Sequence, residues 1–111
     1  MRNGWVHFYL GPETLAGENF IVTLAFDGER LRSYDLRLAD PKYGTSWDDY
    51  SEEKQLAMRD AHDAWLMPQL GSGERKPSMR GPELYYSFLW GEVWSTFDAK
   101  GGSTSIIVRL R

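Results

Sequence analysis

The sequence contains no cysteine, and only two of its 111 residues are histidine. The absence of cysteine excludes a disulfide framework, thiolate metal ligands and a cysteine nucleophile. The histidines do not form an HExxH pair, and no serine lies in a GxSxG context. The sequence therefore offers no catalytic constellation. We expect a protein with no catalytic residues, no bound metal and no cofactor.

Long apolar runs and a basic stripe are also missing. The opening MRNGWVHFYLGPE has one basic residue and a broken apolar run, so it predicts neither a signal peptide nor a membrane span. The net charge is -3, and Arg75, Lys76 and Arg80 fall in GSGERKPSMRGP, whose composition is that of a solvated loop. A protein that neutralises nucleic-acid phosphates needs clustered positive charge. We therefore expect a cytoplasmic protein that binds neither nucleic acid nor membrane.

Alternating apolar and polar side chains predict strands in three parts of the chain. Residues 5–10 form the first, and Gly11-Pro12 ends it. Residues 19–39 contain two runs around Asp27-Gly28, which is a hairpin signal, and residues 91–111 contain two runs around AKGG. These patterns predict an antiparallel sheet of about five strands.

The stretch GGSTS, residues 101–105, raises the question of a phosphate-binding loop. Such a loop needs a helix after the glycines, so that aligned N–H groups point at the anion. Here β-branched residues follow, and Lys100 precedes the glycines instead of following them. We interpret the glycines as the turn of a hairpin.

The pattern changes to a helical period after Pro41, and SWDDYSEEKQLAMRDAHDAWLM predicts one long amphipathic helix over about 47–67. Ser46 and Ser51 are candidate N-caps, and Pro68 and Gly71 end the segment. Its apolar residues share an arc of about 120°, which we expect to pack on one face of the sheet: Tyr50, Ala57, Met58, Ala61, Ala64 and Trp65. Four polar residues lie opposite: Glu52, Arg59, Asp60 and Asp63. The whole chain, residues 1–111, is thus predicted to be a single α+β domain.

Carboxylates and surplus aromatic residues suggest a binding role. We expect a non-catalytic protein-binding domain, most concretely a small acidic bacterial immunity or inhibitor protein that occludes a partner toxin or enzyme. Carboxylates would steer a basic partner, and one or two tryptophans would supply affinity. The predicted partner-binding residues are Asp48, Asp49, Glu52, Glu53, Asp60, Asp63, Trp47 and Trp94.

The sequence leaves two alternative functions open. One is a small-molecule-binding or enzymatic domain with an aromatic-lined pocket between helix and sheet, for which the candidate residues are His7, His62, Trp5 and Tyr9. The other is a subunit of a homo-oligomer that uses an uncovered sheet face or an edge strand.

Overall fold

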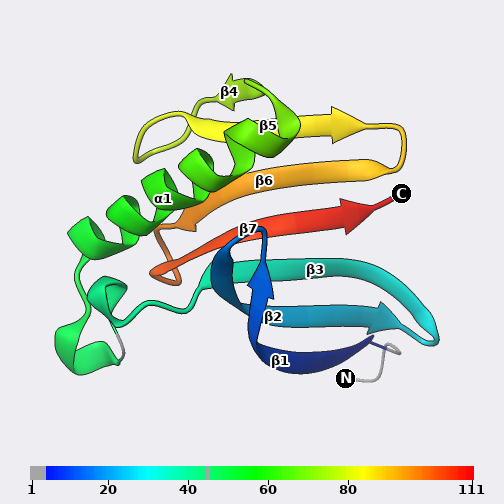
Figure 1. Cartoon of the computed structure of the whole chain (residues 1–111), viewed down its shortest axis with the longest axis horizontal. Helices are drawn as coiled ribbons and strands as arrows, with labels where there is room; N and C mark the ends of the chain where they lie inside the picture. Colours follow the sequence, from blue (N-terminus) through cyan, green and yellow to red (C-terminus); the bar gives the residue numbers. More distant parts are fainter. Residues whose placement is uncertain (1–4, 45) are drawn as a thin grey trace.

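The computed structural model describes residues 5–44 and 46–111. One seven-stranded antiparallel sheet and one long helix form an α+β fold (Figure 1). The elements are β1 (Trp5–Leu15), β2 (Glu18–Asp27), β3 (Arg30–Leu38), the 3-10 helices η1 (Pro41–Tyr43) and η2 (Trp47–Asp49), α1 (Glu52–Leu70), β4 (Glu74–Lys76), β5 (Glu83–Phe88), β6 (Gly91–Asp98) and β7 (Ser103–Leu110). The predicted class is confirmed, but the prediction of about five strands is wrong.

The sheet joins two antiparallel meanders. Its strand order is β1-β2-β3-β7-β6-β5-β4, so β3 of the first meander pairs with the last strand of the second. Leu36 of β3 lies opposite Ile106 of β7 at this junction. The connection from β3 to β4 carries α1 across one face of the sheet (Figure 1).

Two strands account for the difference from the predicted number. β4 has only charged residues, ERK, in a segment rich in glycine and proline, and it pairs through its backbone with β5. β5 carries an apolar signal in ELYYSF that the prediction of two hairpins and one further strand did not include. β1 also continues past Gly11-Pro12 to Leu15, with a register shift between Leu10 and Glu13.

Both predicted hairpin turns are confirmed. Asp27 pairs with Arg30, and Gly28 between them has the positive φ of 64° that a two-residue hairpin loop requires. Asp98 pairs with Ser103 across the second turn, where Gly102 has φ 70° and donates its N–H to the Asp98 carbonyl at 2.7 Å. The GGSTS stretch is therefore a strand turn followed by β7.

The helix starts later and ends later than the sequence pattern predicts. Ser46 caps the short helix η2, and Tyr50 then has extended backbone, so α1 begins only at Glu52. The Ser51 hydroxyl caps it by accepting the Lys54 N–H at 3.0 Å. Pro68 lies inside the last turn, and the helix ends at Leu70.

The predicted orientation of α1 about its own axis is wrong. Ala57 and Ala64, expected against the sheet, are exposed, whereas Arg59 and Asp63, expected to face solvent, are buried. The buried side of α1 consists of Gln55, Met58, Arg59, His62, Asp63 and Leu66. This side can be buried because its charged members have partners on the strands, as described below.

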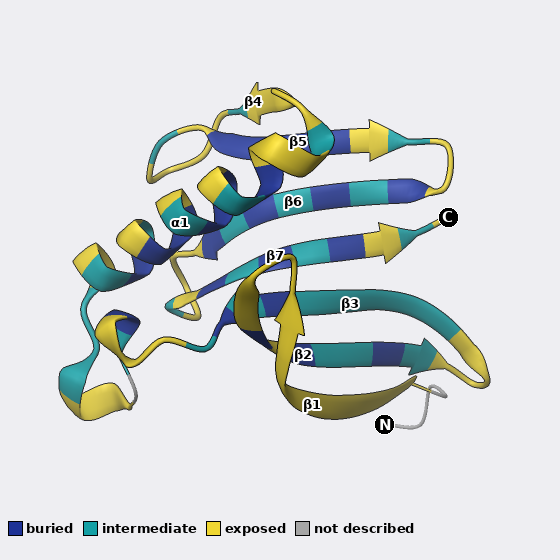
Figure 2. Cartoon of the chain, viewed as in Figure 1, coloured by how far each residue is buried: buried dark blue, intermediate teal, exposed yellow. Residues whose placement is uncertain are grey.

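The core lies between α1 and the sheet face that it covers. Apolar residues from β2, β3, β5, β6 and β7 meet Met58 and Leu66 of α1 there. Figure 2 shows these strands as largely buried or half-buried along the part under α1, whereas β1 is exposed along its whole length. β1 is therefore an edge strand that contributes little to the core.

Candidate functional site

A groove runs along the exposed side of α1. It consists of two adjoining cavities of about 480 and 460 Å³, which share Lys42 and Tyr43 of η1. We call the two together the α1 groove. Residues of α1 and its cap form one wall: Ser51, Glu53, Lys54, Ala57, Ala61, Ala64, Trp65, Pro68 and Gln69. The opposite wall comes from η1 and from Ala16 and Glu18 at the β1–β2 turn. Four residues of the apolar arc predicted to pack on the sheet thus line this groove, namely Ala57, Ala61, Ala64 and Trp65, whereas Met58 of that arc is in the core.

Trp65 fixes the far wall of the groove relative to α1. Its indole Nε1–H donates to the Leu15 carbonyl at 3.2 Å, and its ring packs edge-on against Phe20 at 4.7 Å between centroids. These two contacts tie α1 to the end of β1 and to β2. The groove is therefore bounded by elements held in place by tertiary contacts.

The carboxylates predicted to bind a partner fall into two groups. Asp48, Glu53 and Asp60 are exposed, and none forms an ion pair with another described residue. The other three have structural partners: Asp49 accepts the Ser46 N–H at 2.9 Å, Glu52 pairs with Arg80 at 2.8 Å, and Asp63 pairs with Arg75 at 2.9 Å. Only the first group is free to meet a partner without breaking an internal contact.

The two tryptophans proposed as anchors lie on different surfaces. Trp47, on η2 beside Asp48, is 76% exposed, and its ring contacts Tyr50 at 4.9 Å between centroids. Trp94 alternates with Val93 and Ser95, which are buried on the α1 side, so it lies on the opposite face of the sheet and packs against Tyr85. Trp94 therefore cannot share one contact surface with the carboxylates of α1.

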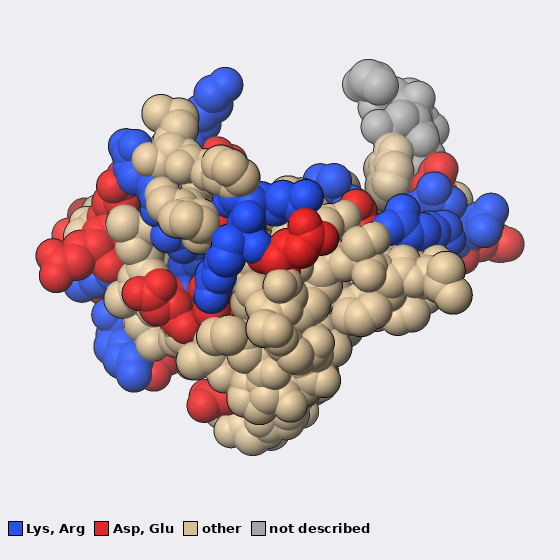
Figure 3. All heavy atoms as spheres, turned by 90° about the horizontal axis from the view of Figure 1, so that it is seen from above, with Lys and Arg blue, Asp and Glu red and all other residues tan. Residues whose placement is uncertain are grey.

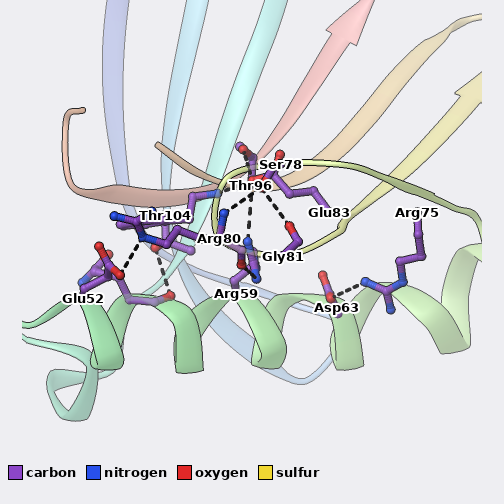
Figure 4. A network of polar contacts seen from close by, with 12 residues as sticks. Glu52, Arg59, Asp63, Arg75, Ser78, Arg80, Gly81, Glu83, Thr96 and Thr104 are labelled. Carbon is purple, nitrogen blue, oxygen red and sulfur yellow. Dashed lines mark hydrogen bonds and ion pairs between the residues drawn. The ribbon is translucent and has the colours of Figure 1, made fainter. Parts of the chain in front are cut away.

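Buried charges of α1 are neutralised by the strands and the loop that precedes β5. The Arg59 guanidinium donates to the Arg80 carbonyl at 2.7 Å and lies 3.8 Å from the Glu83 carboxylate (Figure 4). Glu83 also accepts hydrogen bonds from the Thr96 hydroxyl and the Phe97 N–H. Because these groups contact one another and lie mostly out of solvent, the network is structural.

His62 is a core residue and not part of a pocket. It is fully buried, and its Nε2 accepts the Leu38 N–H at 3.1 Å, so the proton of the neutral ring is on Nδ1. Burial lowers the pKa of His62 to about 4, a shift that nearby Arg37 adds to and Asp63 opposes. The ring is therefore neutral at pH 7 and positions β3 against α1.

The other residues of the predicted small-molecule pocket lie across the sheet from His62. Leu10 pairs with Val22, which faces α1, so the alternating residues Trp5, His7 and Tyr9 lie on the opposite face. The structure therefore does not bring these four residues together. On that opposite face burial raises the pKa of Asp35, against the effects of His7 and Arg109.

Charged residues of both signs are interspersed over much of the surface. In Figure 3 lysines, arginines, aspartates and glutamates occupy the upper and left parts of the view, and a tract of uncharged residues lies below them. No basic stripe of the kind that nucleic acids require is visible on this face.

Over residues 5–44 and 46–111 no group of three or more His, Cys, Asp or Glu side chains is placed to hold a metal ion. In the same part of the chain no helix is both long and apolar enough to cross a membrane.

Comparison with known proteins found no match to any family model, curated protein or solved structure.

Proposed function

We propose that this protein is a non-catalytic protein-binding domain that holds a basic segment of another protein in the α1 groove. A small inhibitor or immunity protein that occludes its target is the most concrete form of this function. The observation that carries the proposal is the orientation of α1. Ala57, Ala61 and Ala64 of its apolar arc line the groove, while Met58 and Leu66 pack on the sheet together with charged residues such as Arg59.

The size of the groove suits a polypeptide segment. Its α1 wall extends from Ser51 to Gln69, which at 1.5 Å per helical residue is about 27 Å. An extended chain of about eight residues covers that length at 3.3 Å per residue. Alanine side chains let the backbone of such a segment approach α1 closely, and half-buried Trp65 supplies an aromatic surface in the groove wall.

The charges of the groove favour a basic segment. Its two lysines have partners, because Lys42 lies 3.7 Å from the Asp40 carboxylate and the Lys54 ammonium donates to the Asp49 carbonyl at 2.7 Å. Glu18 and Glu53 line the groove without an ion pair to a described residue. The described residues that line the groove include three carboxylates and two lysines, Glu18, Asp40, Glu53, Lys42 and Lys54, so its net charge is negative and attracts lysine and arginine side chains.

A peptide-display selection tests this proposal, because it needs no identified partner. Random decapeptides are selected on the purified protein, and we expect the enriched sequences to contain lysine or arginine next to apolar residues. The Ala64→Arg variant places a long cationic side chain in the groove at an exposed helical position where arginine is tolerated. It should lower the affinity for the selected peptides by at least about tenfold, since burial of one misplaced charge costs more than 1.4 kcal/mol.

The matched control is Ala99→Arg, which adds the same side chain to the exposed β6–β7 turn. It should leave the affinity unchanged. Enrichment of acidic peptides, or equal affinity for Ala64→Arg and the wild type, would contradict the proposed function.

A further inference from the structure

A second cavity, outside the α1 groove, lies where the end of β3, η2, the start of α1 and the β6–β7 turn meet. Its volume is about 220 Å³, and its lining includes Arg37, Trp47, Tyr50 and Gln55. Gly102 of the GGSTS turn forms one wall, and a Cβ atom at this glycine would come within 2.8 Å of the Tyr50 hydroxyl. We call this space the Arg37 cavity. It brings together segments from the middle and the end of the chain.

One residue that lines this cavity has a buried hydrogen-bond acceptor without a partner. Gln55 is only 2% exposed, and its side-chain NH₂ donates to the Tyr43 carbonyl at 3.0 Å. That bond fixes which end of the amide is oxygen. The oxygen Oε1 is buried and has no partner among the described residues. An acceptor left in this state costs about 1–3 kcal/mol, so the cavity favours an occupant that brings a donor.

An unpartnered donor lines the same cavity. Nε of Arg37 is buried without a hydrogen-bond acceptor, and Arg37 forms no ion pair with another described residue. None of the other described residues that line the cavity is charged. Two residues that line the cavity thus have unpartnered groups: Arg37 has a positive charge and an N–H, and Gln55 has an acceptor.

We propose that the Arg37 cavity binds a carboxylate that has an N–H group on the neighbouring carbon, as in an α-amino acid or the C-terminal residue of a peptide. The carboxylate is the planar partner that a guanidinium binds through paired hydrogen bonds, and the N–H satisfies Oε1 of Gln55. A phosphate dianion fits less well, since one cation faces two negative charges. The rings of Trp47 and Tyr50 supply an apolar wall for the remainder of the ligand.

Titration followed by ¹H–¹⁵N NMR tests the proposal with defined probes. N-acetylglycine carries both groups, N-acetylglycinamide lacks the carboxylate, and acetate lacks the N–H. We expect saturable shifts of the Gln55 side-chain amide with N-acetylglycine, and affinities at least tenfold weaker with the other two compounds. Arg37→Met should lower the affinity for N-acetylglycine by tenfold or more. Arg109 is an exposed arginine outside the cavity, so Arg109→Met should leave the affinity unchanged.

Two further probes distinguish the source of the ligand. A tripeptide with a free C-terminus that binds more tightly than glycine or N-acetylglycine identifies the end of a polypeptide, and the reverse order identifies a free amino acid. The proposal is overturned if no carboxylate binds, if acetate or inorganic phosphate binds as well as N-acetylglycine, or if Arg37→Met leaves binding intact. The comparison of ligands on the wild-type protein decides the matter even where Arg37→Met fails to fold. This inference goes beyond the α1 groove, so its failure leaves the proposed function standing.

Discussion

The guanidinium of Arg59 and the carboxylate of Glu83 face each other across the interface between α1 and the sheet. Nη1 of Arg59 lies 3.8 Å from Oε2 of Glu83, and the two side chains are only 10% and 9% exposed. This pair, together with the bond from Arg59 to the Arg80 carbonyl, holds the middle of α1 over the start of β5 (Figure 4). It also explains how a charged side of the helix comes to be buried.

Removal of one member of this pair should destabilise the protein strongly. In Glu83→Gln the Arg59 charge stays buried without its counter-charge, which costs about 3 kcal/mol in the free energy of unfolding. Glu74→Gln is the matched control, because Glu74 pairs with Lys76 at 3.3 Å on the surface, where such pairs contribute at most about 1 kcal/mol. Urea denaturation of the three proteins measures the difference. Equal stability of the two variants would show that the Glu83 carboxylate does not stabilise the buried charge of Arg59.

The pKa of His62 makes stability depend on pH in a defined window. The folded-state pKa of about 4 lies below the ordinary value of 6.5, so between these pH values the unfolded chain binds a proton that the folded protein does not. The contribution of neutral His62 to the free energy of unfolding is fully present above pH 6.5. It decreases as the pH is lowered from 6.5 to 4, and below pH 4 it no longer changes. The total loss is about 3 kcal/mol, at 1.4 kcal/mol for each unit of pKa difference.

The variant His62→Gln isolates this effect, because glutamine keeps an acceptor for the Leu38 N–H and does not titrate. Between pH 7 and pH 4 it should lose about 3 kcal/mol less than the wild type in urea denaturation. His7→Gln, which replaces the other, exposed histidine, is measured beside the wild-type curve as the matched control. If the stability of His62→Gln falls with pH as much as that of the wild type, the pH dependence does not come from His62.

The alternating strands were predictable because their pattern is local. Phe20 and Val22 share a face with Leu24 whatever strand lies beside them, and Asp27-Gly28 specifies its turn within the same segment. The rotation of α1 was not predictable in this way. The partners of Arg59 and Asp63 are Glu83 and Arg75, which lie in β5 and β4, beyond the end of the helix. A pattern within the helix cannot show that such charges are compensated.

The same limit explains what the sequence showed of the candidate sites. Exposed Trp47 and the free carboxylates Asp48, Glu53 and Asp60 were among the predicted partner-binding residues, since acidic clusters and surplus aromatic residues are recognisable in the sequence itself. The grooves and cavities depend on segments that meet only in the fold. Arg37 and Gln55 look in the sequence like one strand residue and one helix residue, and their unpaired atoms become evident only when both are buried.

Gly91 should tolerate substitution less well than the turn glycine Gly28. It is buried in β6 opposite Leu110, and a Cβ atom there would overlap the Arg109 carbonyl oxygen. Gly91→Ala must push β6 and β7 apart, at a cost of about 3 kcal/mol. Gly28→Ala is the control: its φ is 64°, which costs alanine about 1 kcal/mol, but no atom lies within 4 Å of the added methyl group. In thermal unfolding, Gly91→Ala should have a lower Tm than Gly28→Ala. The reverse order would contradict the close approach of β6 and β7.

Charge reversal on the outer side of α1 should slow the association of a basic partner. Glu53 and Asp60 are exposed without an ion pair to a described residue, so Glu53→Lys with Asp60→Lys converts local attraction into repulsion. With a basic peptide from the display selection, the association rate constant should fall about tenfold at about 20 mM salt and recover towards the wild-type value at about 0.5 M, where screening is strong.

The double variant Glu29→Lys with Glu74→Lys changes the net charge equally but away from the groove. Since steering depends on where the charge lies, this control should slow association much less. Equal slowing by both double variants would mean that overall charge attracts the peptide, and the α1 groove would then lose its electrostatic role.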